Sequence, residues 1–281
     1  MPTNPQTSAS GLKTFTFQPS GAVRGTAILI HGHGDYSSRY ESILEPFLEQ
    51  GICCVSTDLP GHGESPGKRG FIEGLHAIDD LVQESHSRAR AICPDGPLGL
   101  IGHSVGGLLA LRELLHQRDR YQFAWVSSPL LRPDSTRHPF VVAILRILGP
   151  LFPNIALNTG VSSGDCRHFE NPEEEQTWDD GLFHRQINLG WGLALLHAAE
   201  EIAHGFSESA PELPILFTQG TADPVCDAKF LRAFLSANQF SQATHLEFKD
   251  QLHEPFADSA QEEVRSAIER WLERSLSPRS A

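Results

Sequence analysis

Positive charge is scarce in this sequence, which has 22 lysines and arginines against 35 aspartates and glutamates and a formal net charge of −13. A protein that holds a nucleic-acid backbone needs a basic surface, so the composition argues against nucleic acid as a partner. The same shortage of cations argues against purely electrostatic attachment to an anionic membrane. The composition thus excludes both classes of charge-driven binding.

Cysteine is also scarce, and no group of cysteines has metal-ligand spacing. The count is odd, with Cys53, Cys54, Cys93, Cys166 and Cys226. Cys53 and Cys54 fall inside an apolar strand, where they are expected to pack as small hydrophobic residues. The first ten residues lack the basic and apolar regions of a signal peptide. We therefore expect reduced thiols and a cytoplasmic protein.

Long hydrophobic runs are missing as well. The most apolar stretch, residues 140–152, is interrupted by Arg146, Gly149 and Pro150 and is too short to span a bilayer. The sequence contains no internal repeat and no low-complexity linker. At 281 residues, it is long enough for one α/β domain with an inserted subdomain.

Short apolar runs alternate with longer amphipathic stretches, which is typical of an α/β fold with a mostly parallel central sheet flanked by helices. The expected strands are 14–17, as an antiparallel edge strand, then 28–30, 53–55, 98–101, 125–127, 215–217 and 245–248. The expected helices are 40–49, 74–91, 105–116, 226–236 and 258–276. Helical spacing in the last of these predicts a buried face made of Val264, Ile268, Trp271 and Leu272.

One motif stands at a junction between a strand and a helix. The apolar run 98–101 leads into Gly-His-Ser-Val-Gly at 102–106, and an apolar helix follows. A Gly-x-Ser-x-Gly turn in this context is a nucleophile elbow, in which small flanking residues leave the serine hydroxyl exposed above the sheet. The context predicts that Ser104 is a nucleophile.

A serine nucleophile needs a histidine as its base and an acid that holds the histidine. In α/β folds with such an elbow, the acid follows the serine in the sequence and the histidine follows the acid. Asp223 follows the apolar run 215–217 and precedes Pro224, in a position that also suits an ordinary turn residue. His253 follows the strand expected at 245–248. Their order and placement favour Asp223 as the acid and His253 as the base.

The oxyanion of a tetrahedral intermediate needs hydrogen-bond donors. One comes from the residue after the nucleophile and the other from a loop after an early strand, which points to the backbone N–H groups of Val105 and His33. The side chains of His31 and His33 suggest a metal pair instead, but no cysteine or acidic partner has suitable spacing nearby. We therefore expect no metal at this loop.

The interval between the strand that ends near Ser128 and the one that starts at Pro214 is roughly 80 residues, too long for an ordinary connection. We predict an inserted helical lid at 132–210 and a core made of residues 1–131 and 211–281. The apolar residues Ile144, Ile147 and Trp191 either line an acyl path, contact a lipid surface or pack as a cap. His184 is expected to be an ordinary polar lid residue.

Five blocks of the chain resemble, in order, the monoacylglycerol lipase and lysophospholipase-like branch of the α/β-hydrolases, of the serine aminopeptidase S33 type. They are HGHGDYSSRY at 31–40, DLPGHGESPGKRG at 58–70, GHSVGG at 102–107, GTAD at 220–223 and HE at 253–254. The resemblance implies the α/β-hydrolase fold, the triad Ser104, Asp223 and His253, and the donors His33 and Val105. It also implies that Asp58, His62 and Ser65 brace the elbow. Val105 stands where the family more often has Met, which leaves its backbone donor intact.

The resemblance implies a serine hydrolase that cleaves a small acyl ester, such as a monoacylglycerol or a lysophospholipid, through an acyl-enzyme and without a cofactor. Transient contact of the lid with a lipid surface is a further expectation. The alternatives are a general carboxylesterase or thioesterase for short or aromatic acyl groups, an acyltransferase, and a ligand-binding protein of the same fold without catalysis. The sequence leaves the oligomeric state open.

Overall fold

The computed structural model describes residues 5–132, 139–171, 173–175, 180–208 and 210–276. The strands are β1 (Gln6–Thr7), β2 (Lys13–Phe17), β3 (Gly25–Ile30), β4 (Ile52–Thr57), β5 (Leu98–His103), β6 (Phe123–Ser127), β7 (Ala156–Asn158), β8 (Gln186–Asn188), β9 (Ile215–Gly220) and β10 (Ala243–Phe248). The α-helices are α1 (Glu41–Glu49), α2 (Leu75–Ile92), α3 (Val105–Gln117), α4 (Pro139–Leu148), α5 (Ser163–Cys166), α7 (Leu189–Glu208), α8 (Ala228–Ala237) and α9 (Gln261–Leu276). Short 3₁₀-helices are η1 (Ser37–Tyr40), η2 (Arg118–Arg120) and η3 (Pro255–Ala257).

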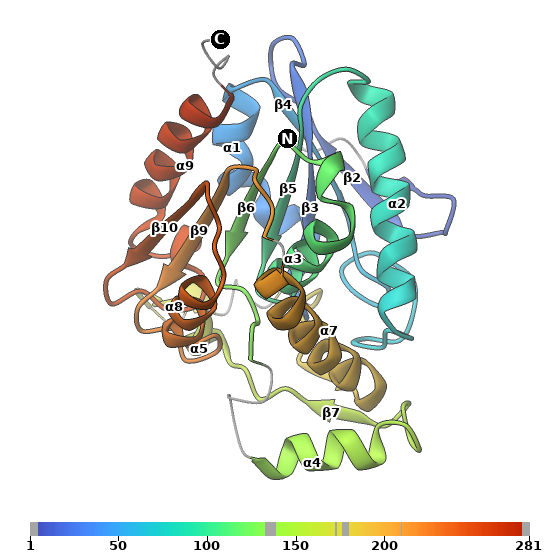
Figure 1. Ribbon diagram of the computed structural model, residues 1–281. Coiled ribbons are helices and arrows are strands. Elements are labelled where there is room, and N and C mark those ends of the chain that lie inside the picture. The colour runs from blue at the N-terminus through green and yellow to red at the C-terminus, as the bar shows by residue number, and fades with distance from the viewer. Residues whose placement is uncertain (1–4, 133–138, 172, 176–179, 209, 277–281) are drawn as a thin grey trace.

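An eight-stranded sheet forms the centre of the molecule, in the order β1-β2-β4-β3-β5-β6-β9-β10 (Figure 1). From β4 to β10 the neighbouring strands are parallel, and β1 and β2 are antiparallel. The carboxyl ends of β3, β5, β9 and β10 therefore meet at one edge of the sheet, where ligands bind in open α/β sheets. The loops that hold the predicted site residues follow these four strands.

Helices cover both faces of the sheet (Figure 1). Alternate residues of β3 show the division: Ala27 and Leu29 pack with α1 and α9, whereas Ile28 and Ile30 pack with α2, α3, α7 and α8. Side chains that alternate between two covered faces produce the continuous apolar runs seen in the sequence. Each face has its own apolar core.

The predicted strands and helices of the core are confirmed, with boundaries that shift by a few residues. The strand predicted at 14–17 pairs antiparallel with β4, but its outer side pairs with the two-residue strand β1, so it is not the edge. Pro255 begins the 3₁₀-helix η3, where its missing N–H costs no hydrogen bond, and α9 starts later than expected. The buried face of α9 contains the four residues that its spacing predicted.

The inserted region holds α4, β7, α5, β8 and α7 (Figure 1). The two strands β7 and β8 form a small antiparallel sheet, which the sequence did not predict because each is three residues long. Helix α4 contacts α7 and lies at one end of the molecule, away from the central sheet (Figure 1). Helix α7 packs along α3, so it joins the insertion to the core. In the part of the chain that is described, no helix is both long and apolar enough to cross a membrane.

Candidate active site

Ser104 occupies a strained turn between β5 and α3. Its backbone has φ 56° and ψ −120°, a conformation that L-residues rarely adopt. The Ser104 N–H donates to the carbonyl of Ser127 at 3.0 Å, which ties the turn to β6. The surroundings thus hold Ser104 in the conformation of a nucleophile elbow, as the motif predicted.

The two glycines of the motif are required by close backbone contacts. A Cβ atom on Gly106 would lie 1.9 Å from the carbonyl oxygen of Ile30, and one on Gly102 would lie 2.3 Å from that of Gly106. Both distances are far below van der Waals contact, so a larger residue at either position would displace the turn. The loop after β3 lies against the turn with more room, because a Cβ on Gly32 would be in ordinary van der Waals contact with the Cβ of Ser104, at 3.4 Å.

The structure brings Asp223 and His253 together in the buried loops after β9 and β10. The Nδ1 atom of His253 donates to Oδ2 of Asp223 at 2.8 Å. The same carboxylate accepts N–H donations from Val225 and Cys226 on Oδ1, and from the amide of Gln219 on Oδ2. These bonds fix the carboxylate and place the proton of neutral His253 on Nδ1, which leaves Nε2 free to accept a proton.

Burial and nearby charges shift the pKa of His253 and that of the neighbouring Cys226 thiol. Burial lowers the pKa of His253, but the hydrogen-bonded carboxylate of Asp223 and the nearby carboxylates of Glu254 and Asp35 together raise it, so the net shift is upward. Burial raises the pKa of the Cys226 thiol well above its ordinary value. Cys226 therefore remains a protonated thiol and does not compete with Ser104 as a nucleophile.

Ser104 and His253 line one cavity of about 400 Å³ at the carboxyl edge of the sheet. Its apolar wall comes from the core and from the insertion, and consists of Val105, Leu130, Leu157, Val161, Phe183, Ile187, Leu195 and Val225. A cavity of this size, mostly apolar with a few convergent polar groups, is typical of a small-molecule site.

His33 and Val105, which were predicted to donate to the oxyanion, line the same cavity. In the described residues, neither backbone N–H is hydrogen-bonded to a protein acceptor. For Val105 this is the normal condition of the first turn of a helix, whose N–H groups lack intrahelical partners. Two free donors therefore lie beside Ser104, one at the start of α3 and one in the loop after β3.

Two of the three predicted lid residues, Ile147 and Trp191, do not line this cavity. Ile147 is 65% exposed and Trp191 is fully buried in the core beside α3, and neither lines the cavity. The side chain of Ile144 lies outside the described residues. The apolar character of these segments was predicted correctly, but sequence spacing alone did not identify the face that lines the cavity. Leu157, Ile187 and Leu195 line it instead.

The sequence analysis missed a charged group at the polar end of the cavity. Arg39 contacts Asp35 at 3.0 Å and Glu254 at 3.3 Å, and both carboxylates line the cavity. Burial raises the pKa of Glu254. Asp35 and Arg39 stand in the block 31–40, and Glu254 follows His253 directly, so proximity to the site motifs was the available signal.

Residues predicted to brace the elbow make several backbone contacts. The buried carboxylate of Asp58 accepts the N–H groups of Ser37 and Glu64, at 2.7 and 2.9 Å. The Ser65 hydroxyl donates to the Asp58 carbonyl at 2.7 Å. His31 uses both ring nitrogens on backbone groups, since Nδ1 lies 2.8 Å from the Gly32 carbonyl and Nε2 accepts the Leu59 N–H.

Comparison with known proteins agrees with this geometry. Residues 21–260 match the family described as serine aminopeptidase, S33. The human monoglyceride lipase is 28% identical over 218 residues, which cover 76% of this chain and 70% of that protein. An abhydrolase domain-containing protein of Dictyostelium discoideum is 27% identical over 265 residues, 93% of this chain, but the chain spans only 27% of that relative.

A solved structure extends the comparison to the fold. The crystal structure of a monoacylglycerol lipase from Paleococcus ferrophilus superimposes with a TM-score of 0.82 at 27% identity, and covers 93% of this chain and 98% of that one. The superposition thus extends over nearly the whole of both chains. The chain therefore belongs to the serine aminopeptidase S33 family of the α/β-hydrolases, in the branch that contains the monoglyceride lipases, and is a serine hydrolase of the esterase and lipase type.

Proposed function

We propose that the protein hydrolyses acyl esters through an acyl-enzyme on Ser104, with His253 as the base and Asp223 as the residue that holds His253. The hydrogen bond from His253 to Asp223 is the observation that carries this proposal, because it leaves Nε2 of the histidine free to take the serine proton. The strained backbone of Ser104 supports the same role.

The reaction follows two steps. The Ser104 Oγ attacks the ester carbonyl carbon as its proton passes to His253, and the N–H groups of His33 and Val105 stabilise the oxyanion. His253 then protonates the leaving alcohol, and the acyl group remains on Ser104. Water that gives its proton to His253 attacks the acyl-enzyme, and the fatty acid leaves as the Ser104 hydroxyl is restored.

The cavity supports a neutral, hydroxyl-bearing head group on a single acyl chain. Its apolar wall suits a hydrocarbon chain, and the titratable acids that line it are Asp35, Asp165 and Glu254. Arg39 pairs with Asp35 and Glu254, so three acids stand against one cation, and the excess of carboxylate accepts hydrogen bonds from hydroxyl groups but repels a phosphate. We therefore propose a monoacylglycerol as the preferred substrate, ahead of a lysophospholipid.

An ester panel tests this substrate class. The efficiency kcat/KM should rise about fourfold per added methylene, because each buried methylene contributes about 0.8 kcal/mol, and then level off when the cavity is full. A monoacylglycerol should exceed lysophosphatidylcholine of the same acyl length roughly tenfold or more. Turnover of acyl-coenzyme A alone would exclude the lipase assignment and favour a thioesterase.

A pair of variants locates the acyl path within this panel. Leu157→Asp should lower the efficiency for long-chain esters much more than for acetate esters, because Leu157 lines the cavity. Ile147→Asp places the same charge on the insertion but outside the cavity, so the chain-length profile should remain that of the parent. Equal profiles for both variants would show that the acyl chain lies elsewhere.

We further propose that the insertion contacts a lipid surface. Five large apolar side chains of this region are exposed, namely Ile147, Leu151, Phe152, Ile155 and Leu157. We call these five side chains the apolar patch of the insertion, and one of them, Leu157, also lines the cavity. Exposed apolar patches on soluble domains commonly mark protein or membrane contacts.

Neutral phosphatidylcholine vesicles test the patch, because the negatively charged protein gains no attraction from their charge. The double change Leu151→Asp with Phe152→Asp should lower the fraction of protein bound to vesicles about tenfold, since two exposed apolar groups lose their burial. Val23→Asp changes an exposed apolar residue outside the patch and should have no effect. Equal sedimentation of all three proteins with vesicles would contradict the contact.

The compartment and the catalytic competence are also proposals. The thiols of Cys53, Cys54, Cys93, Cys166 and Cys226 are all free, and this supports the reducing cytoplasm as the location. The hydrogen-bonded Asp223 and His253 disfavour a ligand-binding protein that has lost catalysis.

A further inference from the structure

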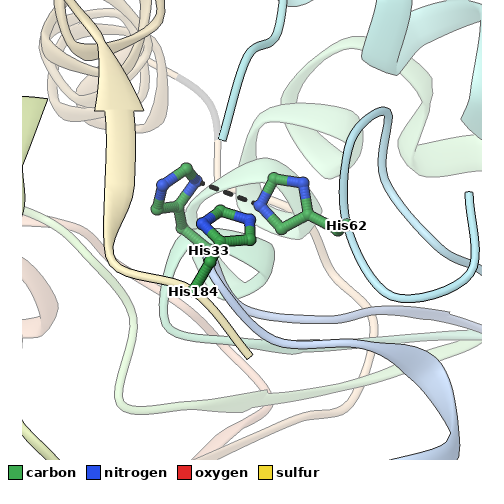
Figure 2. Close-up of side chains that lie close together, drawn as sticks. All are labelled: His33, His62 and His184. Atoms are coloured by element: carbon green, nitrogen blue, oxygen red, sulfur yellow. Dashed lines mark hydrogen bonds between the residues drawn. The ribbon is translucent and has the colours of Figure 1, made fainter. Parts of the chain in front are cut away.

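Three histidines that are distant in the sequence meet beside the catalytic cavity. His33 comes from the loop after β3, His62 from the loop after β4, and His184 from the segment before β8, and Figure 2 shows their rings gathered together. The ring centroids are 4.9 Å apart for His33 and His62, 4.4 Å for His62 and His184, and 5.4 Å for His33 and His184. One ring nitrogen from each lies within 4.8 Å of the other two.

Hydrogen bonds to backbone carbonyls decide which nitrogens carry protons. A carbonyl oxygen only accepts, so His33 must donate from Nε2 to Gln186, and His62 must donate from Nδ1 to Pro60, at 2.8 and 2.9 Å. In the neutral rings, the other two nitrogens then carry lone pairs. These two, Nδ1 of His33 and Nε2 of His62, face each other at 3.3 Å (Figure 2). Two lone pairs at this distance repel each other unless a positive charge or a shared donor lies against both.

His184 adds a third ring, which packs edge-on against His33 and at a tilt against His62. Both of its ring nitrogens are shielded from solvent and neither is hydrogen-bonded, in the described part of the chain. Buried polar atoms without a partner are costly, and such atoms in a native fold call for a ligand or a bound water.

We propose that His33, His62 and His184 bind a divalent transition-metal ion of the zinc class. Zinc prefers imidazole nitrogen at 2.0–2.1 Å in a tetrahedral arrangement, in which neighbouring ligand atoms are about 3.3 Å apart. The lone-pair nitrogens of His33 and His62 are separated by 3.3 Å, which is one edge of such a tetrahedron. The fixed hydrogen bonds on their opposite nitrogens orient both rings, as outer-sphere partners of metal-bound histidines do.

The position of the three rings would let an ion enter from the catalytic cavity and would link the insertion to the core. His33 and His184 line the catalytic cavity, whereas His62 is fully buried behind them. The fourth coordination position would therefore face the cavity. His184 belongs to the insertion, and its backbone N–H donates to the Gly34 carbonyl at 3.0 Å. A bound ion would therefore strengthen the contact between the insertion and the loop that contains His33.

A zinc competition titration tests the site on the full chain after dialysis against a chelator. In competition with a chromophoric chelator for zinc, the protein should take up one zinc ion per chain. His184→Phe keeps an aromatic ring of similar shape but removes the ligand, and should weaken binding roughly 100-fold or more. His33→Gln retains a donor for the Gln186 carbonyl and should weaken binding similarly. His76→Phe removes an exposed histidine whose side chain is 69% accessible, and should change nothing.

Two further measurements test zinc binding without any ester turnover. Cobalt(II) should give the visible absorption of a tetrahedral site in the parent and in His76→Phe, but not in His184→Phe. Zinc should raise the melting temperature of the parent more than that of His184→Phe, since an ion that binds only the folded state stabilises it. Protein whose Ser104 is blocked by a fluorophosphonate should still bind the ion. Equal zinc affinity of the parent and both ligand variants, or no binding by the parent, would overturn the proposal.

Discussion

Replacement of Ser104 by alanine should abolish covalent labelling by a fluorophosphonate and lower kcat on the order of a million-fold, with the fold retained. The Ser104 hydroxyl faces the cavity and contributes to the chemistry, whereas the turn is held by backbone hydrogen bonds and by the glycines around it. Loss of the nucleophile in a triad removes nearly all the rate that the triad supplies, and leaves only oxyanion stabilisation and binding. Steady-state turnover of a soluble ester, together with circular dichroism, measures both effects.

Ser236→Ala is the matched control. Ser236 is exposed on α8 and its hydroxyl donates only to the carbonyl of Arg232. Its loss should leave turnover and labelling at the parent values. A Ser104→Ala protein that keeps substantial turnover would move the nucleophile to another residue.

Asp223→Asn should lower kcat about 10⁴-fold while the protein remains folded. The carboxylate accepts one hydrogen bond from His253 and another from Gln219 on Oδ2, and two backbone N–H groups on Oδ1. An asparagine turned to keep the backbone donors on its oxygen presents an NH₂ group to His253, which favours the wrong histidine tautomer. The nucleophile remains in place, so slow labelling of Ser104 should persist.

Asp250→Asn tests whether the effect belongs to the site. Asp250 lies in the same loop as His253, with a side chain that is 81% exposed and a φ of 60° that asparagine tolerates. Its kinetics should match those of the parent. If Asp223→Asn lost less than tenfold in kcat, another acid would have to orient His253.

The core of the fold and the pairing of Asp223 with His253 were accessible from the sequence because their signals are local. Continuous apolar runs indicate strands of a parallel sheet that is buried on both faces. The glycines around Ser104 indicate a tight turn, in which a Cβ atom would collide with backbone oxygens. Asp223 and His253 follow late strands that lie side by side in the sheet. Parallel register then brings these distant loops to one edge.

The insertion was less predictable because its contacts depend on tertiary packing. The apolar residues Ile147 and Trp191 read alike in the sequence, yet one faces outward and the other is buried against the core. The zinc proposal departs from the expectation of no metal at His33, which rested on the lack of nearby ligands in the sequence. His184 reaches His33 only because β8 and the segment before it fold back over the loop after β3, a contact that no spacing rule contains.

The central claim is that Ser104 carries the acyl group, and mass spectrometry of the trapped enzyme tests it directly. After brief incubation with a fluorophosphonate, digestion should yield one modified peptide, with the added mass on Ser104. The adduct should fail to form when His253 is replaced by alanine, because the hydroxyl then has no base. An adduct on any other residue, or equal labelling of the His253→Ala protein, would contradict the account.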